Sequence, residues 1–466
     1  MKINVSSEII KLAEIFEKNG EDLYLVGGYV RDSILGRIST LHNDIDLCSA
    51  CKPEKVVRIL KDTDFSVDDS NSKLGIIIIT GQERYEYATF RRENYNNNGE
   101  HNPTGIEFVK SITDDAKRRD FTINAVYYNI LGDQIEDPVL GLEDLQKQLI
   151  RCVSGAQESF MQDSERILRM IRLACSLNFD IEQKTLIAAY TAYNGVSNLS
   201  KDRIRREFDR MLVCDTYYPT VDTKYAHAKC MLLIGELNLW QFILPAVEQL
   251  QLSTIRDEKN EEIYSHIINT LAVCEPNARL SCLLHDVGKL YTKTQKNNFN
   301  FSGDWADIII EKNLGIEGLY YPKKTIEQTK RIVAALDYDK HGLEFKSSVR
   351  KFIRKNIDIF SEICNLKDAI ALENTEFTTK SKIAAKWRRI YKRMLDNNTP
   401  FTLAELNVKG GDIIEAIPEI KVTQVNKLLN YLLDYCLAHP IANSKDTLIV
   451  IAKKQVLKNA EIYFEK

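Results

Sequence analysis

The hydrophobic pattern of this 466-residue chain changes near residue 150, and this change limits the folds that the chain can adopt. Before it, short apolar runs between turn residues predict strands, and after it strand patterns almost vanish. The predicted strands are 22–26, 45–48, 75–80, 85–90, 106–109, 125–129 and 134–136. The predicted helices are 7–19, 164–177, 201–213, 226–237, 263–273, 278–284, 324–336, 381–395 and 422–438. The fold class is therefore an α+β N-terminal part, a mixed sheet with helices, followed by an all-α remainder.

Composition excludes several other classes of protein. Hydrophobic residues make up 44% of the chain and charged residues 28%, as in soluble globular proteins rather than disordered or fibrous ones. The densest apolar run, 76–79, is too short for a membrane span, and we expect no leader peptide. The ten cysteines predict reduced thiols in a cytoplasmic protein, with no thiolate zinc or redox site. The net charge of −3 excludes a globally basic nucleic-acid binder but allows a local basic surface.

Two aspartates on one predicted strand form a candidate metal site. Asp44 and Asp46 are two residues apart, so their side chains point to the same face of the strand. Carboxylate oxygens in this arrangement can bind two Mg²⁺ ions for an in-line phosphoryl transfer. The alternative is a solvated surface pair. Glu86, on a neighbouring predicted strand, is either a third catalytic carboxylate or an exposed strand residue.

A glycine pair lies upstream of these aspartates, between a predicted strand and a predicted helix. Gly27 and Gly28 would let backbone N–H groups approach a triphosphate closely, and a helix N-terminus favours anions. Arg31 would add a bidentate phosphate contact. The alternative is an ordinary strand–helix turn with Arg31 at the surface.

Five blocks, in order along about 200 residues, together resemble the class II tRNA nucleotidyltransferases and the bacterial poly(A) polymerases. The first joins Leu25-Val26-Gly27-Gly28-Tyr29-Val30-Arg31-Asp32 to Asp44-Ile45-Asp46-Leu47. The others are Arg118 to Ala125, Asp137 to Arg151, Gln162 to Arg172 and Arg203 to Glu207. The resemblance implies four parts: a catalytic head over 1–150, a helical neck with a base-recognition helix over 151–215, a helical body over 216–345 and a helical tRNA-binding tail over 346–466.

The resemblance also implies an activity and a nucleotide pocket. Members of this family add C, C and A to the 3′ end of tRNA from CTP and ATP, with protein side chains in place of a nucleic-acid template. Arg119, Asp120 and Asn124 would line the pocket, although Asp120 alone also suits a helix cap. Asp163, Arg166, Arg169 and Arg172 would belong to the base-recognition helix.

Asp163 and Arg166 have a physical reason to select C and A. A carboxylate only accepts hydrogen bonds and a guanidinium only donates them, whereas cytosine and adenine each present an amino donor beside a ring-nitrogen acceptor. Three residues apart, the two side chains would share one face of a helix. The alternative is a surface salt bridge, and Gln162 stands where the family usually has Glu.

The polar segment 92–105 predicts a loop, and its length is close to that of relatives that complete the whole CCA. It ends in Glu100-His101-Asn102-Pro103, where the family more often has arginines before the proline. CC-only addition, A-only addition and poly(A) synthesis therefore remain alternatives.

A second candidate metal site lies in the helical part. His285-Asp286, with His266 upstream, matches the signature of HD phosphohydrolases, but the further ligands of that superfamily are missing. These residues either bind a metal or form a packed structural unit. A hydrolytic HD protein with an inactive head is the hypothesis from a different class.

The segment 380–393 is the most basic part of the chain. It carries seven Lys and Arg residues and no acidic one, with aromatic residues between them. The predicted RNA-contacting residues are Lys386, Arg388, Arg389 and Arg393. Since double-stranded RNA is recognised mainly by shape and phosphates, such a surface would bind the acceptor stem and T-arm of tRNA. The alternative is a solvated amphipathic helix.

Overall fold

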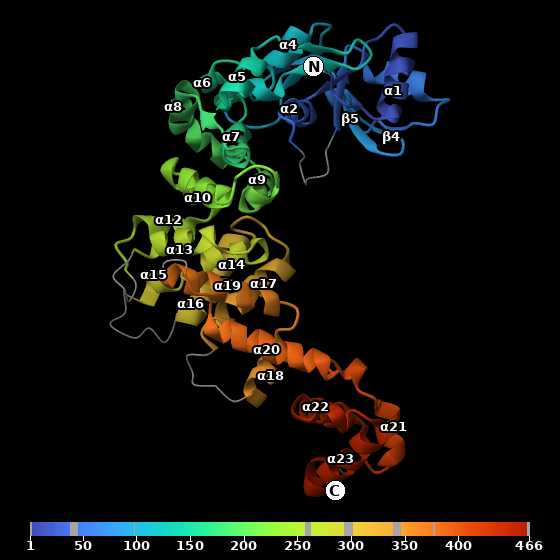
Figure 1. The fold of residues 1–466 in the computed structure, drawn as a ribbon, viewed down its shortest axis with the longest axis vertical. Helices are drawn as coiled ribbons and strands as arrows, with labels where there is room; N and C mark the ends of the chain where they lie inside the picture. The colour runs from blue at the N-terminus through green and yellow to red at the C-terminus, as the bar shows by residue number, and fades with distance from the viewer. Residues whose placement is uncertain are drawn as a thin grey trace. The chain divides into compact units, whose positions relative to one another are not determined.

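The computed structural model describes residues 2–37, 45–96, 98–256, 262–292, 302–338, 346–375 and 378–463 (Figure 1). The chain separates into two compact units. The first comprises Met1–Ile268 and Glu311–Pro322, and the second Asn269–Ile310 and Lys323–Lys466. The four predicted parts divide the chain more finely than these two units and stay a prediction.

The N-terminal part of the first unit contains a seven-stranded sheet in the order β3-β4-β5-β2-β1-β8-β9. Only β2 and β5 pair in parallel, so the sheet is mixed, as predicted. Its strands are β1 Tyr24–Val26, β2 Ile45–Ser49, β3 Ser66–Asp68, β4 Ile76–Thr80, β5 Arg84–Thr89, β8 Tyr127–Asn129 and β9 Gln134–Glu136. All of them except β3 were predicted from the alternation of apolar residues.

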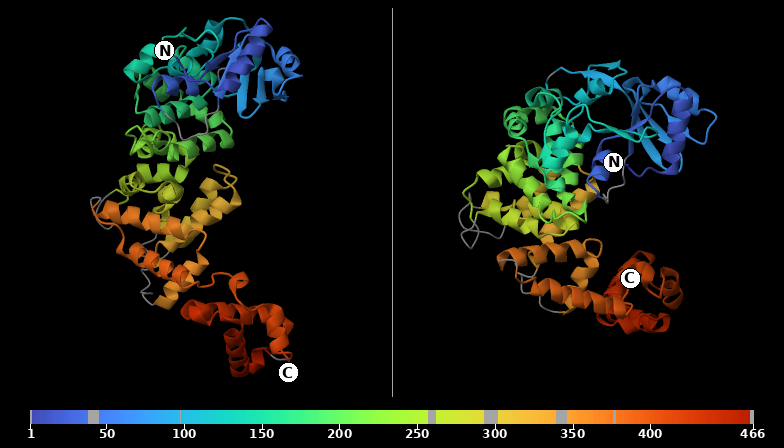
Figure 2. Two further views of the ribbon diagram at one scale, coloured as in Figure 1. Left: turned by 45° about the vertical axis from the view of Figure 1, so that its right-hand side comes forward. Right: turned by 45° about the horizontal axis from the view of Figure 1, so that its top comes forward.

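The two faces of this sheet carry different residues because side chains alternate along each strand. On one face, Tyr85 and Tyr87 pack into a core with α1 (Ser7–Lys18) and α3 (Pro53–Leu60). Figures 1 and 2 show α1 lying beside the sheet. On the other face, a smaller apolar cluster includes Cys48 and Tyr127. This second face also carries Asp46, and it is the one on which the candidate site is built.

The predicted loop over 92–105 is partly wrong. Residues Arg91–Asn94 form β6, which pairs antiparallel with β7 (Gly105–Phe108). Arg92 pairs with Glu107 across the two strands and also forms an ion pair with Asp114 (2.7 Å). The hydrophobic pattern predicted β7 as the strand 106–109, but it did not reveal β6, whose four residues are all polar.

Helices account for most of the rest of the first unit, as predicted. They are α2 Gly28–Ile34, α4 Ile112–Lys117, α5 Gly141–Lys147, α6 Ala156–Gln162, α7 Glu165–Leu177, α8 Gln183–Ala192, α9 Lys201–Leu212, α10 Ala226–Glu236, α11 Trp240–Ile243, α12 Pro245–Leu252 and the first part of α13 Ile263–Ala272. Two short strands, β10 Leu149–Ile150 and β11 Asp180–Ile181, pair in parallel. Helix α7 is the central one, because every residue in it except Arg169 is buried and it packs against α9 and α10.

In the described residues of the second unit, all the regular secondary structure is helical. Its helices are α14 Arg279–Leu284, α15 Lys289–Thr292, most of α16 Ser302–Leu314, α17 Lys323–Ala335, α18 Lys346–Lys355, α19 Phe360–Asn374, α20 Lys382–Asp396, α21 Gly410–Ala416, α22 Val422–Ala438, α23 Lys445–Lys458 and α24 Ala460–Tyr463. The last four surround a core of their own that includes Leu428, Leu432 and Leu448 (Figure 2). No helix in the described ranges is long and apolar enough to cross a membrane.

Two cysteines bear on the expectation that the chain has no thiolate zinc or redox site. Cys48 and Cys51 have the C-x-x-C spacing of zinc and redox sites, which the sequence analysis did not include. Both are buried, and burial raises the pKa of Cys51 to about 12 and that of Cys48 still further. Burial therefore favours the protonated thiol at both positions, and the reactive thiolate is disfavoured.

Candidate active site

The register of the sheet brings two of the predicted catalytic carboxylates together. Asp46 on β2 is paired with Glu86 on β5, and its other neighbour is Val26 on β1. Paired residues on adjacent strands direct their side chains to the same face. Asp46 is half-buried and Glu86 is exposed. Two carboxylates side by side fit the oxygen ligands that Mg²⁺ prefers. Asp44, the third predicted carboxylate, lies outside the described residues.

Gly27 allows the backbone to approach Asp46. Its φ of +77° is a conformation that residues with a side chain rarely adopt. A Cβ atom at this position would lie 2.6 Å from Asp46 Oδ2. Gly28 begins α2, and a Cβ there would lie 3.4 Å from Arg31 Nη2. The glycine pair thus lies between the carboxylate and the guanidinium, where a triphosphate is expected.

Arg31 is buried rather than exposed at the surface, with a relative exposure of 6%. Its Nε donates to Asp32 Oδ1 (2.8 Å) and its Nη1 to Asn124 Oδ1 (2.8 Å). Its Nη2 donates to the hydroxyl of Tyr218 (2.9 Å), a residue that the sequence analysis did not single out. The surface alternative for Arg31 is therefore wrong.

The hydrogen bonds continue from Asn124 to the base-recognition helix. Asn124 Nδ2 donates to Asp120 Oδ1 (3.2 Å), and Arg169 on α7 donates to Asp120 Oδ2 from Nε (2.8 Å) and Nη2 (2.6 Å). Burial alone would raise the pKa of Asp120, but Arg169 outweighs it and lowers this pKa to about 2. Arg31, Asn124, Asp120 and Arg169 thus form one connected network of predicted site residues.

Asp163 does not share a helix with Arg166, so that detail of the prediction is wrong. Helix α6 ends at Gln162 and α7 begins at Glu165, and Asp163 lies between them. Its Oδ1 accepts a hydrogen bond from the backbone N–H of Glu165 (3.0 Å), as helix-capping residues do. The chain turn still brings Asp163 Oδ2 within 3.9 Å of Arg166 Nε. Both side chains are buried, so the surface salt-bridge alternative is also wrong.

His101, in the segment after β6, contacts Asp163 and Glu165. Its Nδ1 lies 2.9 Å from Asp163 Oδ2 and 3.1 Å from Glu165 Oε2. Arg203, from the last motif, also binds Glu165 (2.7 Å). Ligand atoms of His101, Asp163 and Glu165 lie within 4.8 Å of one another, a spacing that would suit a metal ion. The sequence analysis marked His101 only as a departure from the family.

Asp115 is a buried acceptor that the sequence analysis missed. It is fully buried on α4 and accepts hydrogen bonds from Arg118 (2.8 Å), Arg119 (3.1 and 3.2 Å) and Tyr127 (2.7 Å). Burial raises the pKa of Asp115, but the two arginines outweigh it and lower this pKa to about 2. The spacing of Asp115 three and four residues before the arginine pair was a usable signal. Arg119, predicted to bind nucleotide, is held by these contacts.

Other motif residues join secondary-structure elements. Arg172 Nε donates to Glu207 Oε2 on α9 (2.7 Å), which connects the base-recognition helix to the last motif. In the third motif, Asp137 accepts from the backbone N–H groups of Gly141 (2.7 Å) and Leu142 (2.9 Å) at the start of α5. These blocks therefore have a clear structural role.

The HD residues are divided between the two units. His266 belongs to the first, and His285 and Asp286 to the second. His285 Nδ1 is 2.6 Å from the carbonyl oxygen of Cys282, and Lys289 Nζ is 2.6 Å from Asp286 Oδ2. A lysine ammonium on this carboxylate disfavours a second cation there. Metal binding by these three residues stays a prediction.

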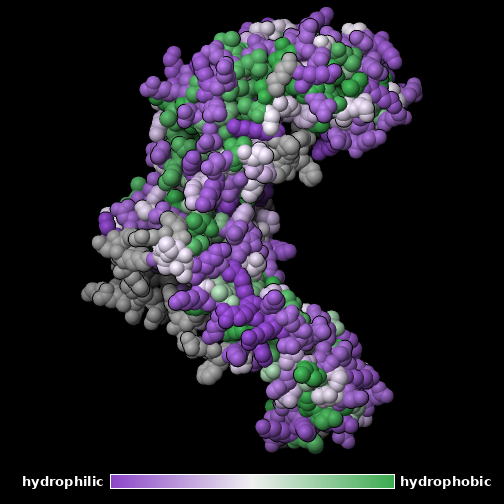
Figure 3. Space-filling model, in the orientation of Figure 1, coloured by the Kyte–Doolittle hydropathy of each residue, from purple (hydrophilic) through white to green (hydrophobic). Residues whose placement is uncertain are grey.

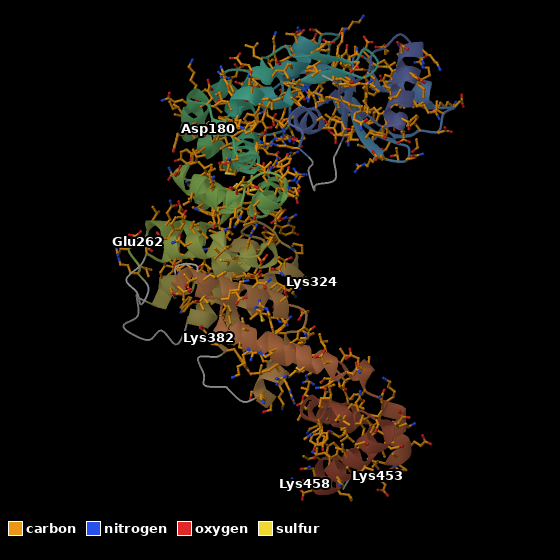
Figure 4. All side chains as sticks on the ribbon, in the orientation of Figure 1. Asp180, Glu262, Lys324, Lys382, Lys453 and Lys458 are labelled. Atoms are coloured by element: carbon orange, nitrogen blue, oxygen red, sulfur yellow. The ribbon has the colours of Figure 1, made fainter. Side chains whose placement is uncertain are left out.

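The basic segment forms α20. Figure 3 shows hydrophilic residues over this helix, and Lys382, at its first position, is labelled in Figure 4. Lys386, Arg389 and Arg393 are exposed and make no ion pair with any described residue. Arg388 differs, because it binds Asp368 (2.6 Å) and Asn365 (2.9 Å). Three of the four predicted RNA contacts are therefore available to a polyanion.

Comparisons with known proteins agree with this architecture. The Poly A polymerase head domain family matches residues 23–151. A CCA-adding enzyme of Streptococcus mutans is 26% identical over 453 residues, 96% of this chain and 97% of that one. A CCA-adding enzyme of Streptococcus sanguinis is 36% identical over 206 residues, 44% of this chain and 50% of that one.

A solved structure shares the fold. The Bacillus stearothermophilus CCA-adding enzyme in complex with CTP aligns with a TM-score of 0.69 at 21% identity, over 97% of this chain and 98% of that one. The likeness shows that the chain has the fold of this enzyme. The N-terminal part of the chain matches the Poly A polymerase head domain family, and the chain along most of its length is similar to CCA-adding enzymes.

The low pKa of Asp115 predicts a pH-dependent contribution to stability. A carboxyl whose pKa is lower in the folded state stabilises the fold above its ordinary pKa of 3.8, and this contribution is lost as pH falls towards about 2. Asp115→Asn should therefore lower the melting temperature strongly at pH 7, by a loss of about 3–5 kcal/mol for a broken buried ion pair. The difference between variant and wild type should shrink below pH 4. Calorimetry across pH 7 to 2.5 measures it, and a difference independent of pH would contradict the assignment.

Proposed function

We propose that this protein adds CCA to the 3′ end of tRNA from CTP and ATP without a nucleic-acid template. The observation that carries the proposal is the placement of Asp46 between Gly27 and Glu86, together with the hydrogen bonds that lead from Arg31 through Asn124 and Asp120 to α7. The similarity of the chain to CCA-adding enzymes supports it. We also infer a cytoplasmic location, because all ten cysteines are free thiols.

Asp46, together with Asp44, is proposed to hold two Mg²⁺ ions, with Glu86 beside them. Bound Mg²⁺ would activate the 3′-hydroxyl of the tRNA and neutralise the departing pyrophosphate. The backbone of Gly27 and Gly28 and the guanidinium of Arg31 would hold the triphosphate next to these carboxylates. The roles of these residues are thus positioning and charge neutralisation, as in phosphoryl transfer generally.

Asp163 and Arg166 are proposed to select the base. Asp163 would accept a hydrogen bond from the amino group of C or A, and Arg166 would donate to the ring nitrogen beside it. Oδ2 of Asp163 now accepts from His101, so His101 would move away when a base binds or share this oxygen with it. Uracil and guanine would leave a donor or an acceptor of the pair unmatched.

The assay that tests the proposal uses three tRNA transcripts, which end at the discriminator base, at C and at CC. Each is incubated with Mg²⁺ and with CTP, ATP or both, and the product ends are sequenced. The proposal expects all three to be extended to CCA and no further. Products that stop at CC, extension of the CC-ended transcript only, or long A tails would instead identify a CC-adding enzyme, an A-adding enzyme or a poly(A) polymerase. Asp46→Asn is the inactive control.

Replacement of Gly27 should abolish nucleotide addition for a reason that is specific to its position. In Gly27→Ala the new Cβ collides with Asp46 Oδ2, and we expect kcat/KM for CTP to fall by at least a hundredfold. Gly36→Ala is the matched control, since Gly36 has a similar φ of +63° but nothing within 4 Å of a new Cβ. Both variants carry backbone strain of about 1–2 kcal/mol, and only the first meets the carboxylate. Equal loss of activity in the two would contradict the assignment.

The exposed cations of α20 should bind the tRNA backbone. A triple variant replaces three of these cations with glutamine: Lys386, Arg389 and Arg393. We expect it to bind tRNA at least tenfold more weakly. The slope of log Kd against log salt should also decrease by up to about three, because up to three phosphate contacts are lost. The matched control neutralises Lys453, Lys454 and Lys458, three exposed lysines on α23 (Figure 4). Fluorescence anisotropy with labelled tRNA measures both. An equal loss in the control would attribute the effect to net charge and contradict a surface on α20.

A further inference from the structure

Tyr218 makes an unusual set of contacts for a residue outside every motif. It follows the short 3₁₀ turn Cys214–Thr216 and precedes α10, and its relative exposure is 4%. Its hydroxyl lies 2.9 Å from Arg31 Nη2 and 3.0 Å and 3.2 Å from the two carboxylate oxygens of Asp32. One buried hydroxyl therefore meets two charged residues of the first motif, Arg31 and Asp32.

The direction of these hydrogen bonds follows from the groups. A guanidinium only donates, so Arg31 donates to the tyrosine oxygen and the tyrosine proton goes to Asp32. Burial raises the pKa of Tyr218, Asp32 raises it further and Arg31 opposes both, with a net increase. The hydroxyl therefore keeps its proton at neutral pH and satisfies both partners at once.

Arg31 is oriented by three partners from separate parts of the chain. Nε binds Asp32 on α2, Nη1 binds Asn124 and Nη2 binds Tyr218. Three of the five N–H groups are used in this way, and the other two make no hydrogen bond with any described residue, so a ligand beside Gly28 can accept from them. A guanidinium that is already fixed loses little freedom when it binds a phosphate. The ring of Tyr218 is itself packed below Arg37, 5.9 Å from the guanidinium carbon to the ring centroid.

We propose that Tyr218 is a positioning residue for nucleotide binding, whose hydroxyl holds Arg31 in the orientation that receives the triphosphate. The proposal rests on the proposed function, in which Arg31 binds that group. Tyr218 itself does not touch the nucleotide. Because it acts on the triphosphate and not on the base, it affects CTP and ATP alike and leaves base choice unchanged.

Tyr218→Phe tests the proposal, because it removes the hydroxyl and keeps the ring. The neighbouring residue supplies a matched control. Tyr217 is similarly buried, at 2%, but its hydroxyl donates to the backbone carbonyl of Arg210 (2.8 Å), and the charged motif residues that act on it are Arg172 and Glu207 instead of Arg31 and Asp32. Tyr217→Phe therefore has the same chemical change and a similar loss of one buried hydrogen bond.

Two measurements on the full-length chain separate the roles. In Tyr218→Phe we expect KM for CTP and for ATP to rise about tenfold, equivalent to about 1.4 kcal/mol, with kcat and misincorporation of UTP unchanged. The affinity for inorganic tripolyphosphate, measured by titration calorimetry with Mg²⁺ and no tRNA, should fall by the same factor. Tyr217→Phe should stay within twofold of wild type in both. Equal behaviour of the two variants, or an effect on one nucleotide only, would overturn the proposal.

A double variant tests whether Tyr218 acts through Arg31. Adding Tyr218→Phe to Arg31→Gln should cause no further loss of tripolyphosphate affinity, whereas independent effects would multiply and contradict the proposal.

The calorimetric result also separates this inference from the proposed function. A wild-type chain that binds tripolyphosphate but extends no tRNA would refute the function, and the comparison of Tyr218→Phe with Tyr217→Phe would still decide the role of Tyr218. A wild-type chain that does not bind tripolyphosphate would overturn the inference.

Discussion

The ion pair between Asp120 and Arg169 is the interaction on which the candidate site depends. It connects Asn124, in the 3₁₀ turn Thr122–Asn124, and through it Arg31 on α2, with α7, which carries predicted base-recognition residues. The carboxylate of Asp120 is largely buried, whereas the side chain of Arg169 is 34% exposed. Such a pair is weak evidence of stability, but removing Arg169 would leave the Asp120 carboxylate without its main compensating charge. A network in which each side chain forms hydrogen bonds with the next therefore fixes the arrangement of these elements. In this arrangement a nucleotide would meet its phosphate contacts and its base contacts at once.

Much of this arrangement could be predicted from the sequence because it follows from periodicity and local spacing. The apolar runs in 45–48 and 85–90 predicted two strands, and Glu86 was a candidate third carboxylate on the second of them. Helical spacing predicted α7 and α9. The motifs that contain Arg31, Asp120 and Asn124 were found as blocks of sequence, and the structure joins them by hydrogen bonds.

The rest depends on contacts between residues that are distant in sequence, and no local pattern records them. Tyr218 meets Arg31 across 187 residues, and His101 meets Asp163 across 62. Strand β6 consists of polar residues only, so 92–105 was expected to be a loop, although its partner β7 was predicted as a strand. Asp163 was placed on a helix because its spacing to Arg166 is helical, whereas it lies between α6 and α7 and accepts a hydrogen bond from the first backbone N–H of α7. Each of these differences involves polar groups, whose partners are set by the tertiary fold and not by hydrophobic periodicity.

A double-mutant cycle between Asp120 and Arg169 tests most directly whether one network connects the sheet to the base-recognition helix. Asp120→Asn, Arg169→Gln and the double variant would be compared by kcat/KM for CTP addition and by the ratio of CTP to UTP incorporation. The account predicts that each single variant loses at least tenfold in kcat/KM. It also predicts that kcat/KM of the double variant is no lower than that of the less active single variant, which corresponds to a coupling energy between Asp120 and Arg169 of about 1.4 kcal/mol or more. Losses that multiply in the double variant would show that the two residues act independently and would contradict the account.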